Sequence, residues 1–191
     1  MKTRHCHRLI VGLFSLSVLA AVDLTAGLVQ ADSVGPYYGM PSWDQTLPSA
    51  TRFIILSNFN SEAVLDRNTG LVWEKSPTRV QASGQTWAVA RLACANSTVG
   101  GQKGWRLASL PELTSLVDPT QSSPSLPLGH PFTNVQFATT DTYWSATKYA
   151  EAANPTLAWI VSFGSGNVAI FNVNFGSQLW CVRGGMNAEA Y

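Results

Sequence analysis

Short apolar runs occur near both ends of the globular part of the chain. Short runs that are rich in β-branched and aromatic residues, bounded by glycine, asparagine or proline, are typical of strands. The first runs are residues 53–56 and 63–74, and the second is predicted to be a hairpin because Asn68-Thr69-Gly70 supplies its turn. Further strands are predicted late in the chain, at residues 143–147, 156–163, 167–173 and 178–183.

Between these segments the apolar residues follow the period of a helix. Trp87, Ala90 and Cys94 fall on one face of a helix predicted over residues 86–96. Thr86 can cap its first turn. The apolar face of a helix is buried, so the thiol of Cys94 is expected in the core.

A second helix is predicted to begin at Ser109, which forms a capping box with Glu112. The apolar stripe of this helix consists of Leu110, Leu113, Leu116 and Val117. Asp118-Pro119 ends the helix, and residues 119–141 form a long loop. Because helices come early and strands late, the expected fold class is α+β with an antiparallel sheet.

The N-terminus carries the pattern of a secretory signal peptide over residues 1–31. Basic residues are followed by an uncharged apolar run at residues 9–22, and Val29-Gln30-Ala31 predicts cleavage after Ala31. A membrane anchor is the alternative, but the run is shorter than the roughly 20 residues that span a bilayer. We therefore expect an extracytoplasmic protein, whether periplasmic, secreted or at the cell surface, with no transmembrane segment after cleavage.

The mature chain has the size of about one domain. An irregular lead-in is expected at residues 32–60, a globular domain at residues 61–186 and a tail at residues 187–191. Removal of the signal peptide takes away three of the 12 basic and one of the 11 acidic residues, which leaves a net charge of −1. This charge argues against nucleic acid or an anionic membrane as a partner.

The mature chain retains two cysteines, Cys94 and Cys181. In an oxidising compartment an even pair is most simply a disulfide, and two buried free thiols are the alternative. No zinc site is expected, because His130 is the one histidine left and zinc needs three or four ligands. His130 is interpreted as a loop side chain.

The sequence offers no arrangement that is typical of an enzyme. No Gly-x-Ser-x-Gly turn is present to expose a nucleophilic serine. The acids that a hydrolase could use have structural interpretations: Glu112 in the capping box, Asp118 at a helix end and Asp66 before a turn. We therefore expect a protein without catalytic activity.

Tryptophan is highly buried on average, so most of these side chains are interpreted as core residues and not as platforms for sugars. The tryptophans interpreted in this way are Trp73, Trp87, Trp105, Trp144, Trp159 and Trp180. Trp43, Tyr37 and Tyr38 lie in the lead-in and are expected to be more exposed.

Several motifs occur in an order that resembles one known family. They are DRNTGLVWE at 66–74, TWAVARLAC at 86–94, GWRLASLPEL at 104–113, YWSAT at 143–147 and WCVRGG at 180–185. Together they resemble the bacterial extracytoplasmic domains typified by the C-terminal domain of the Lcl collagen-like adhesin. The resemblance extends over about residues 62–185.

The order of these motifs is also similar, more loosely, to the C-type lectin-like fold, with two short helices packed on a twisted antiparallel sheet. That similarity implies a disulfide between Cys94 on the first helix and Cys181 in the last strand. The Glu-Pro-Asn, Gln-Pro-Asp and Trp-Asn-Asp triplets of calcium-dependent lectins are absent, and Asn154-Pro155 is the nearest remnant. No calcium ion or other cofactor is therefore expected.

The resemblance to the adhesin implies a secreted or surface-associated binding module. Its ligand would be a surface glycan, such as a glycosaminoglycan, or another surface polymer. The sequence has no cluster of basic residues, which a sulfated polymer would favour. The alternative is a structural or assembly subunit of an envelope complex, with an envelope protein as its partner.

Overall fold

The computed structural model describes residues 47–77, 84–150 and 156–184. All of them belong to the unit Ser33–Tyr191. A separate unit, Met1–Asp32, lies outside the described residues. The predicted signal peptide, the first part of the lead-in and the predicted tail therefore fall outside this description.

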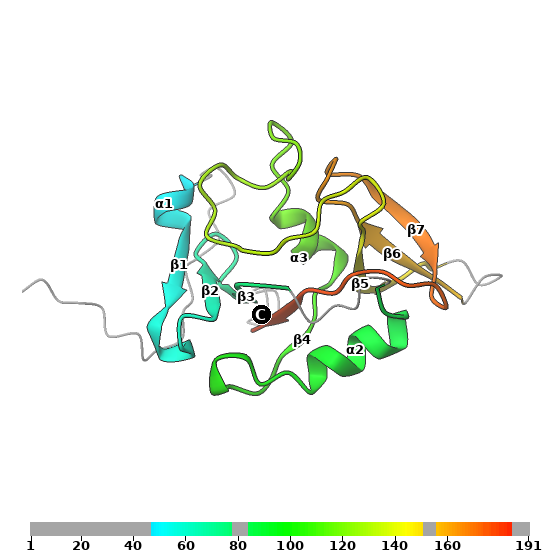
Figure 1. Ribbon diagram of the computed structural model, residues 1–191, viewed down its shortest axis with the longest axis horizontal. Helices are drawn as coiled ribbons and strands as arrows, with labels where there is room; N and C mark the ends of the chain where they lie inside the picture. Colours follow the sequence, from blue (N-terminus) through cyan, green and yellow to red (C-terminus); the bar gives the residue numbers. More distant parts are fainter. Residues whose placement is uncertain (1–46, 78–83, 151–155, 185–191) are drawn as a thin grey trace, which may run out of the picture. The chain divides into compact units, whose positions relative to one another are not determined.

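The described chain forms two antiparallel sheets with a few short helices (Figure 1), so the predicted α+β class is confirmed. The five-stranded sheet has the order β1-β2-β3-β8-β4, with β1 (Phe53–Leu56), β2 (Ala63–Asp66), β3 (Leu71–Glu74), β4 (Arg106–Leu107) and β8 (Cys181–Arg183). The three-stranded sheet has the order β5-β6-β7, with β5 (Tyr143–Lys148), β6 (Leu157–Val161) and β7 (Val168–Asn172). The helices are α1 (Ser49–Arg52), α2 (Trp87–Ala95) and α3 (Leu110–Ser115), with 3-10 turns η1 (Ser57–Phe59) and η2 (Val99–Gly101).

The structure has two sheets where the sequence predicts one. The segment between β7 and β8 belongs to neither sheet. Gln178 instead forms an isolated parallel bridge with Tyr143, and Ser177 forms one with Gln85. The last strand is therefore shorter than predicted and starts at Cys181. At the other end of the domain, α1 and β1 lie within residues 32–60, where an irregular lead-in is predicted.

The predicted buried face of α2 is confirmed, since Trp87, Ala90 and Cys94 are all buried. Thr86 stands at the N-cap position but makes no side-chain capping bond. The carbonyl of Val173 accepts a hydrogen bond from the backbone N–H of Trp87 at 3.0 Å. A carbonyl from a distant segment thus accepts a hydrogen bond from the first turn of α2, where the Thr86 side chain was expected to accept one.

The capping box of α3 is confirmed. The backbone N–H of Ser109 donates to Oε2 of Glu112 at 2.8 Å. The helix ends at Ser115, earlier than its apolar stripe suggests. Leu113 and Leu116 nevertheless point into the core. Leu116 is the C-cap residue, and its backbone N–H donates to the carbonyl of Leu113 at 3.1 Å.

Alternate residues of the five-stranded sheet contribute to two separate buried clusters. The first cluster contains α3 residues and is centred on Trp180, whose ring contacts Phe132, Phe163 and Trp73 at centroid distances of 5.0, 5.3 and 5.6 Å. The second contains α2 residues and the two cysteines. Successive side chains in a strand point to opposite faces, so each helix packs on its own side of the sheet (Figure 1).

Two adjacent glycines in η2 give a direct test of one close contact. Gly100 and Gly101 both have positive φ, at 64° and 70°. A Cβ on Gly100 would lie 2.6 Å from Cβ of Phe59, whereas a Cβ on Gly101 would have nothing within 4 Å.

We expect Gly101→Ala to cost about 1–2 kcal/mol, because a left-handed conformation is unfavourable for alanine. Gly100→Ala should cost about 1–3 kcal/mol more, because it adds a clash with Cβ and the backbone of buried Phe59 to the same strain. Urea unfolding of both variants beside the wild type measures the difference. Equal losses of unfolding free energy in the two variants would contradict the contact with Phe59.

Candidate functional site: an aromatic face on the three-stranded sheet

The residues considered for catalysis lie apart and are each engaged locally. Arg106 Nη1 donates to Glu112 Oε2 at 2.7 Å. Burial raises the pKa of Glu112, but hydrogen bonds from Arg106 and from the backbone of Ser109 outweigh burial and leave this pKa below its ordinary value. Asp118 is partly exposed, and hydrogen bonds from Thr120 lower its pKa. Both carboxyl groups are therefore held in the ionised form.

His130 packs in the loop that follows α3. Its ring stacks on Phe132 at a centroid distance of 5.8 Å. Burial lowers the pKa of His130, which favours the neutral imidazole. Among the residues that the structure describes, no group of three or more His, Cys, Asp or Glu side chains comes together in a way that could hold a metal ion.

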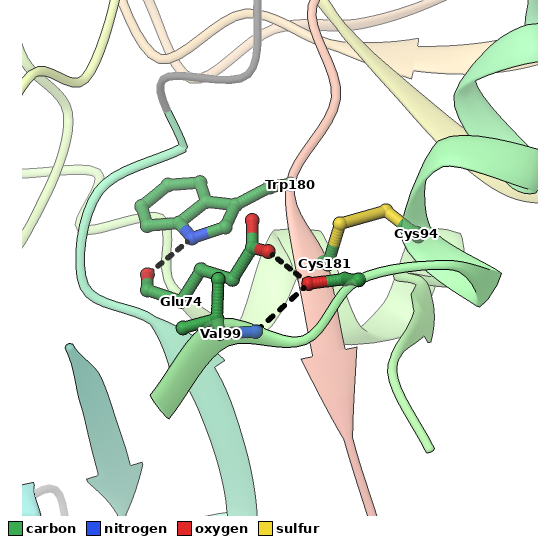
Figure 2. The surroundings of a disulfide bond; sticks show 6 residues. Glu74, Cys94, Val99, Trp180 and Cys181 are labelled. Carbon is green, nitrogen blue, oxygen red and sulfur yellow. Dashed lines mark hydrogen bonds between the residues drawn. A yellow bond between two sulfur atoms is a disulfide. The ribbon is translucent and has the colours of Figure 1, made fainter. Parts of the chain in front are cut away.

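The two cysteines are joined, as predicted. The disulfide links Cys94 of α2 to Cys181 of β8, with their Cα atoms 5.3 Å apart and both residues fully buried. Figure 2 shows Glu74 and Trp180 beside this link. Trp180 Nε1 donates to the carbonyl of Glu74 at 2.8 Å, and Ser97 Oγ donates to Oε1 of Glu74 at 2.9 Å. These contacts tie α2 and the turn after it to β3 and β8, which is a structural role.

One side of the three-stranded sheet carries aromatic and aliphatic side chains that are at least partly exposed. Trp159 in β6 lies directly opposite Ile170 in β7. The ring of Tyr149 meets that of Trp159 edge-to-face, with centroids 5.5 Å apart and an interplanar angle of 78°. Ile170 is 40% exposed and its neighbour on the same side, Val168, is 41% exposed. We call Tyr149, Trp159, Val168 and Ile170 the aromatic face.

The other side of the same sheet is covered. Ala158 and Ile160 belong to the second buried cluster, and Phe171 packs against it. Val161 shares a side with Trp159, yet it lies in the first cluster with residues of α3. Helix α3 therefore covers the Val161 end of the side that carries Trp159, and it leaves the aromatic face open to solvent.

The interpretation of all six tryptophans as core residues is wrong for Trp159. The others are buried, but Trp159 is only partly buried and belongs to neither cluster. Its position in β6 determines this outcome, because its side chain points away from the second cluster while its neighbours Ala158 and Ile160 point into it.

Most of the described residues match one known protein family. Residues 62–183 match the Lcl C-terminal domain. The chain belongs to the Lcl C-terminal domain family. No curated protein matches the chain. The Lcl C-terminal domain thus includes both cysteines of the disulfide, both sheets from β2 to β8 and the aromatic face, while α1 and β1 precede it.

Within this Lcl C-terminal domain the fold also brings together two cations that are far apart in the sequence. The guanidinium of Arg91 lies 4.7 Å from the ring centroid of Trp87, and Nζ of Lys148 lies 4.9 Å from it. The sequence shows no basic cluster because these cations come from different elements, α2 and β5. Lys148 pairs with Ala158, on the covered side of the sheet, so the two cations do not belong to the aromatic face.

None of the helices in the described part of the Lcl C-terminal domain and its lead-in has the length and apolar character needed to cross a membrane.

Proposed function

We propose that the protein is an extracytoplasmic, non-catalytic binding module that attaches to a glycan or another surface polymer through the aromatic face. The observation that carries this proposal is the partial exposure of Trp159, paired with Tyr149 and flanked by exposed Ile170 and Val168. Large apolar side chains gathered on a surface are unfavourable in water and commonly mark a binding site.

The covalent framework supports a lectin-like arrangement within the α+β class. A buried cysteine on the first long helix, α2, is joined to the last strand, β8, as the resemblance to C-type lectin-like domains implies. A disulfide is also what a compartment outside the cytoplasm permits. The extracytoplasmic location therefore rests on the disulfide and on the predicted signal peptide together.

Binding to a glycan array in the presence of EDTA tests the proposal. We expect the wild-type protein to bind at least one glycan and to keep that binding without calcium. Trp159→Ala should weaken it by about tenfold or more, which corresponds to about 1.4 kcal/mol of lost contact. Phe175→Ala is the matched control, because Phe175 is an aromatic residue that is 59% exposed but lies outside the aromatic face. Equal binding by Trp159→Ala and the wild type would contradict the proposal.

A second candidate is an assembly subunit of an envelope complex. The observation that favours it is the outer surface of α2, where Leu92 is 61% exposed and Val89 is 45% exposed. A helix that is apolar on both sides commonly packs against a partner on the second side. Under this alternative, Leu92→Glu would abolish co-purification with a fixed envelope protein and Trp159→Ala would not.

A further inference from the structure

None of the four residues of the aromatic face carries a charge. Neither β6 nor β7 contains a charged residue. Lys148, which directly precedes Tyr149, lies on the covered side of the sheet over the ring of Trp87. A sulfate or carboxylate group bound at Trp159 would therefore lose water without gaining a cation from either strand, and desolvation of an unpaired charge is strongly unfavourable.

The geometry of the rings gives the site its shape. Because the rings of Trp159 and Tyr149 meet at 78°, they form a corner and not one continuous flat platform. Ile170 extends the Trp159 side, since residues directly opposite in an antiparallel pair have Cβ atoms only about 4.5–5.5 Å apart. The corner suits a compact ligand with an apolar face that stacks on one of the two rings.

The size of the site decides between a sugar and a protein. A stable protein interface uses about 20–30 residues on each side. Among the residues that the structure describes, the aromatic face has four side chains, and at one end it adjoins the part of the sheet that α3 covers. A surface of this size matches one or two sugar units.

We infer that the ligand of the aromatic face is an uncharged pyranose, whose C–H face stacks on Trp159 in the corner made with Tyr149. This inference rests on the proposed function and narrows its ligand to neutral glycans, in contrast to the sulfated polymers that the adhesin resemblance suggests. The hydroxyl groups of such a sugar remain at the rim of the site and stay hydrated, so no buried polar partner is required.

Titration of the full mature protein with defined sugars tests the inference. The probes are neutral hexasaccharides of glucose, N-acetylglucosamine, galactose and mannose, with heparin as the sulfated comparison. The signal is the indole N–H resonance of Trp159 in a ¹H–¹⁵N spectrum, assigned by its loss in Trp159→Phe. We expect at least one neutral hexasaccharide to shift this resonance, with an affinity that is the same at low and high salt because no ion pair is screened.

The variants separate stacking from general surface stickiness. Trp159→Ala should weaken binding of the neutral sugar by about tenfold or more, and Trp159→Phe should weaken it less because a ring is kept. Phe175→Ala should bind as the wild type does. The folded state of each variant is checked by its spectrum before titration.

Two results would overturn the inference. The first is failure of every neutral hexasaccharide at 10 mM, about the limit of weak specific binding, to shift the Trp159 resonance. The second is binding of heparin alone, abolished by salt and by Arg91→Ala but unaffected by Trp159→Ala. That second result would move the site to the cations at Trp87, which keeps a glycan-binding module but rejects its attachment through the aromatic face. Failure of the wider proposal is recognised separately, by the absence of any ligand on the array.

Discussion

Removing the disulfide between Cys94 and Cys181 is expected to cause a large loss of unfolding free energy. The two residues are 87 positions apart, and both are fully buried. Chain statistics for a loop of this length give a loss of about 4–5 kcal/mol when the cross-link is absent from the denatured state. A domain is typically stable by only about 5–15 kcal/mol. The bond therefore provides a large share of the total.

Cys94→Ala, Cys181→Ala and the double variant should lose similar amounts of unfolding free energy, because each breaks the same bond. Denaturant unfolding of the three variants and the wild type, with and without reductant, measures these losses. Reductant should lower the midpoint of the wild type and leave the double variant unchanged. An unchanged wild-type midpoint, when thiol labelling finds both cysteines free, would refute the stabilising role.

The regular elements were predictable because local pattern is sufficient for them. The short apolar segments at residues 53–56 and 63–74 became β1, β2 and β3, and the hairpin turn lies where Asn68-Thr69-Gly70 indicated. The capping box at Ser109 identified the start of α3. In these cases neighbouring residues determine the backbone, and distant contacts only reinforce it.

The division into two sheets was not predictable in the same way. It depends on where the chain at Gln178 pairs, and that pairing is with Tyr143, 35 residues earlier. A short apolar run bounded by turn residues indicates a strand, but it does not show which strand lies beside it. The replacement of the Thr86 cap by the carbonyl of Val173 has the same origin, because that carbonyl belongs to a remote segment.

The candidate site was missed for a related physical reason. The average burial of tryptophan favours the core for every Trp, whereas the exposure of Trp159 depends on how far α3 extends over β6. One sequence signal could have found it. Residues 157–161 are apolar throughout, which is unusual for a strand with one solvent face and indicates that its outer side has a role.

One contact that the sequence did not indicate is the buried ion pair between Arg52 and Asp66. The sequence pattern indicated for Asp66 only a position before a turn. In the structure Arg52 Nε and Nη2 donate to the two carboxylate oxygens, each at 2.8 Å, and both side chains are buried. Asp66 also accepts hydrogen bonds from the backbone N–H of Asn68 and from Thr69 Oγ1, both at 3.0 Å. The carboxylate thus holds α1 and the β2–β3 turn together.

Asp66→Ala is expected to destabilise the domain by about 3–5 kcal/mol, because it leaves the Arg52 guanidinium buried without its counter-ion. Arg52→Ala should cost less, since Asp66 keeps the hydrogen bonds of the turn, from Asn68 and Thr69. The double variant should cost clearly less than the sum of the two single changes, because neither charge is then left alone in the core.

Urea unfolding of the four proteins completes a double-mutant cycle for this pair. Arg67→Ala is the matched control, because Arg67 is next to Asp66 in the sequence but is exposed, and its side chain donates to the carbonyl of Thr51 at 3.3 Å. Its loss should be within about 0.5 kcal/mol, as for most surface substitutions. High salt should change the coupling little, because a buried pair is poorly screened. Losses from Arg52→Ala and Asp66→Ala that add to within about 0.5 kcal/mol would show that the two side chains do not act as a pair.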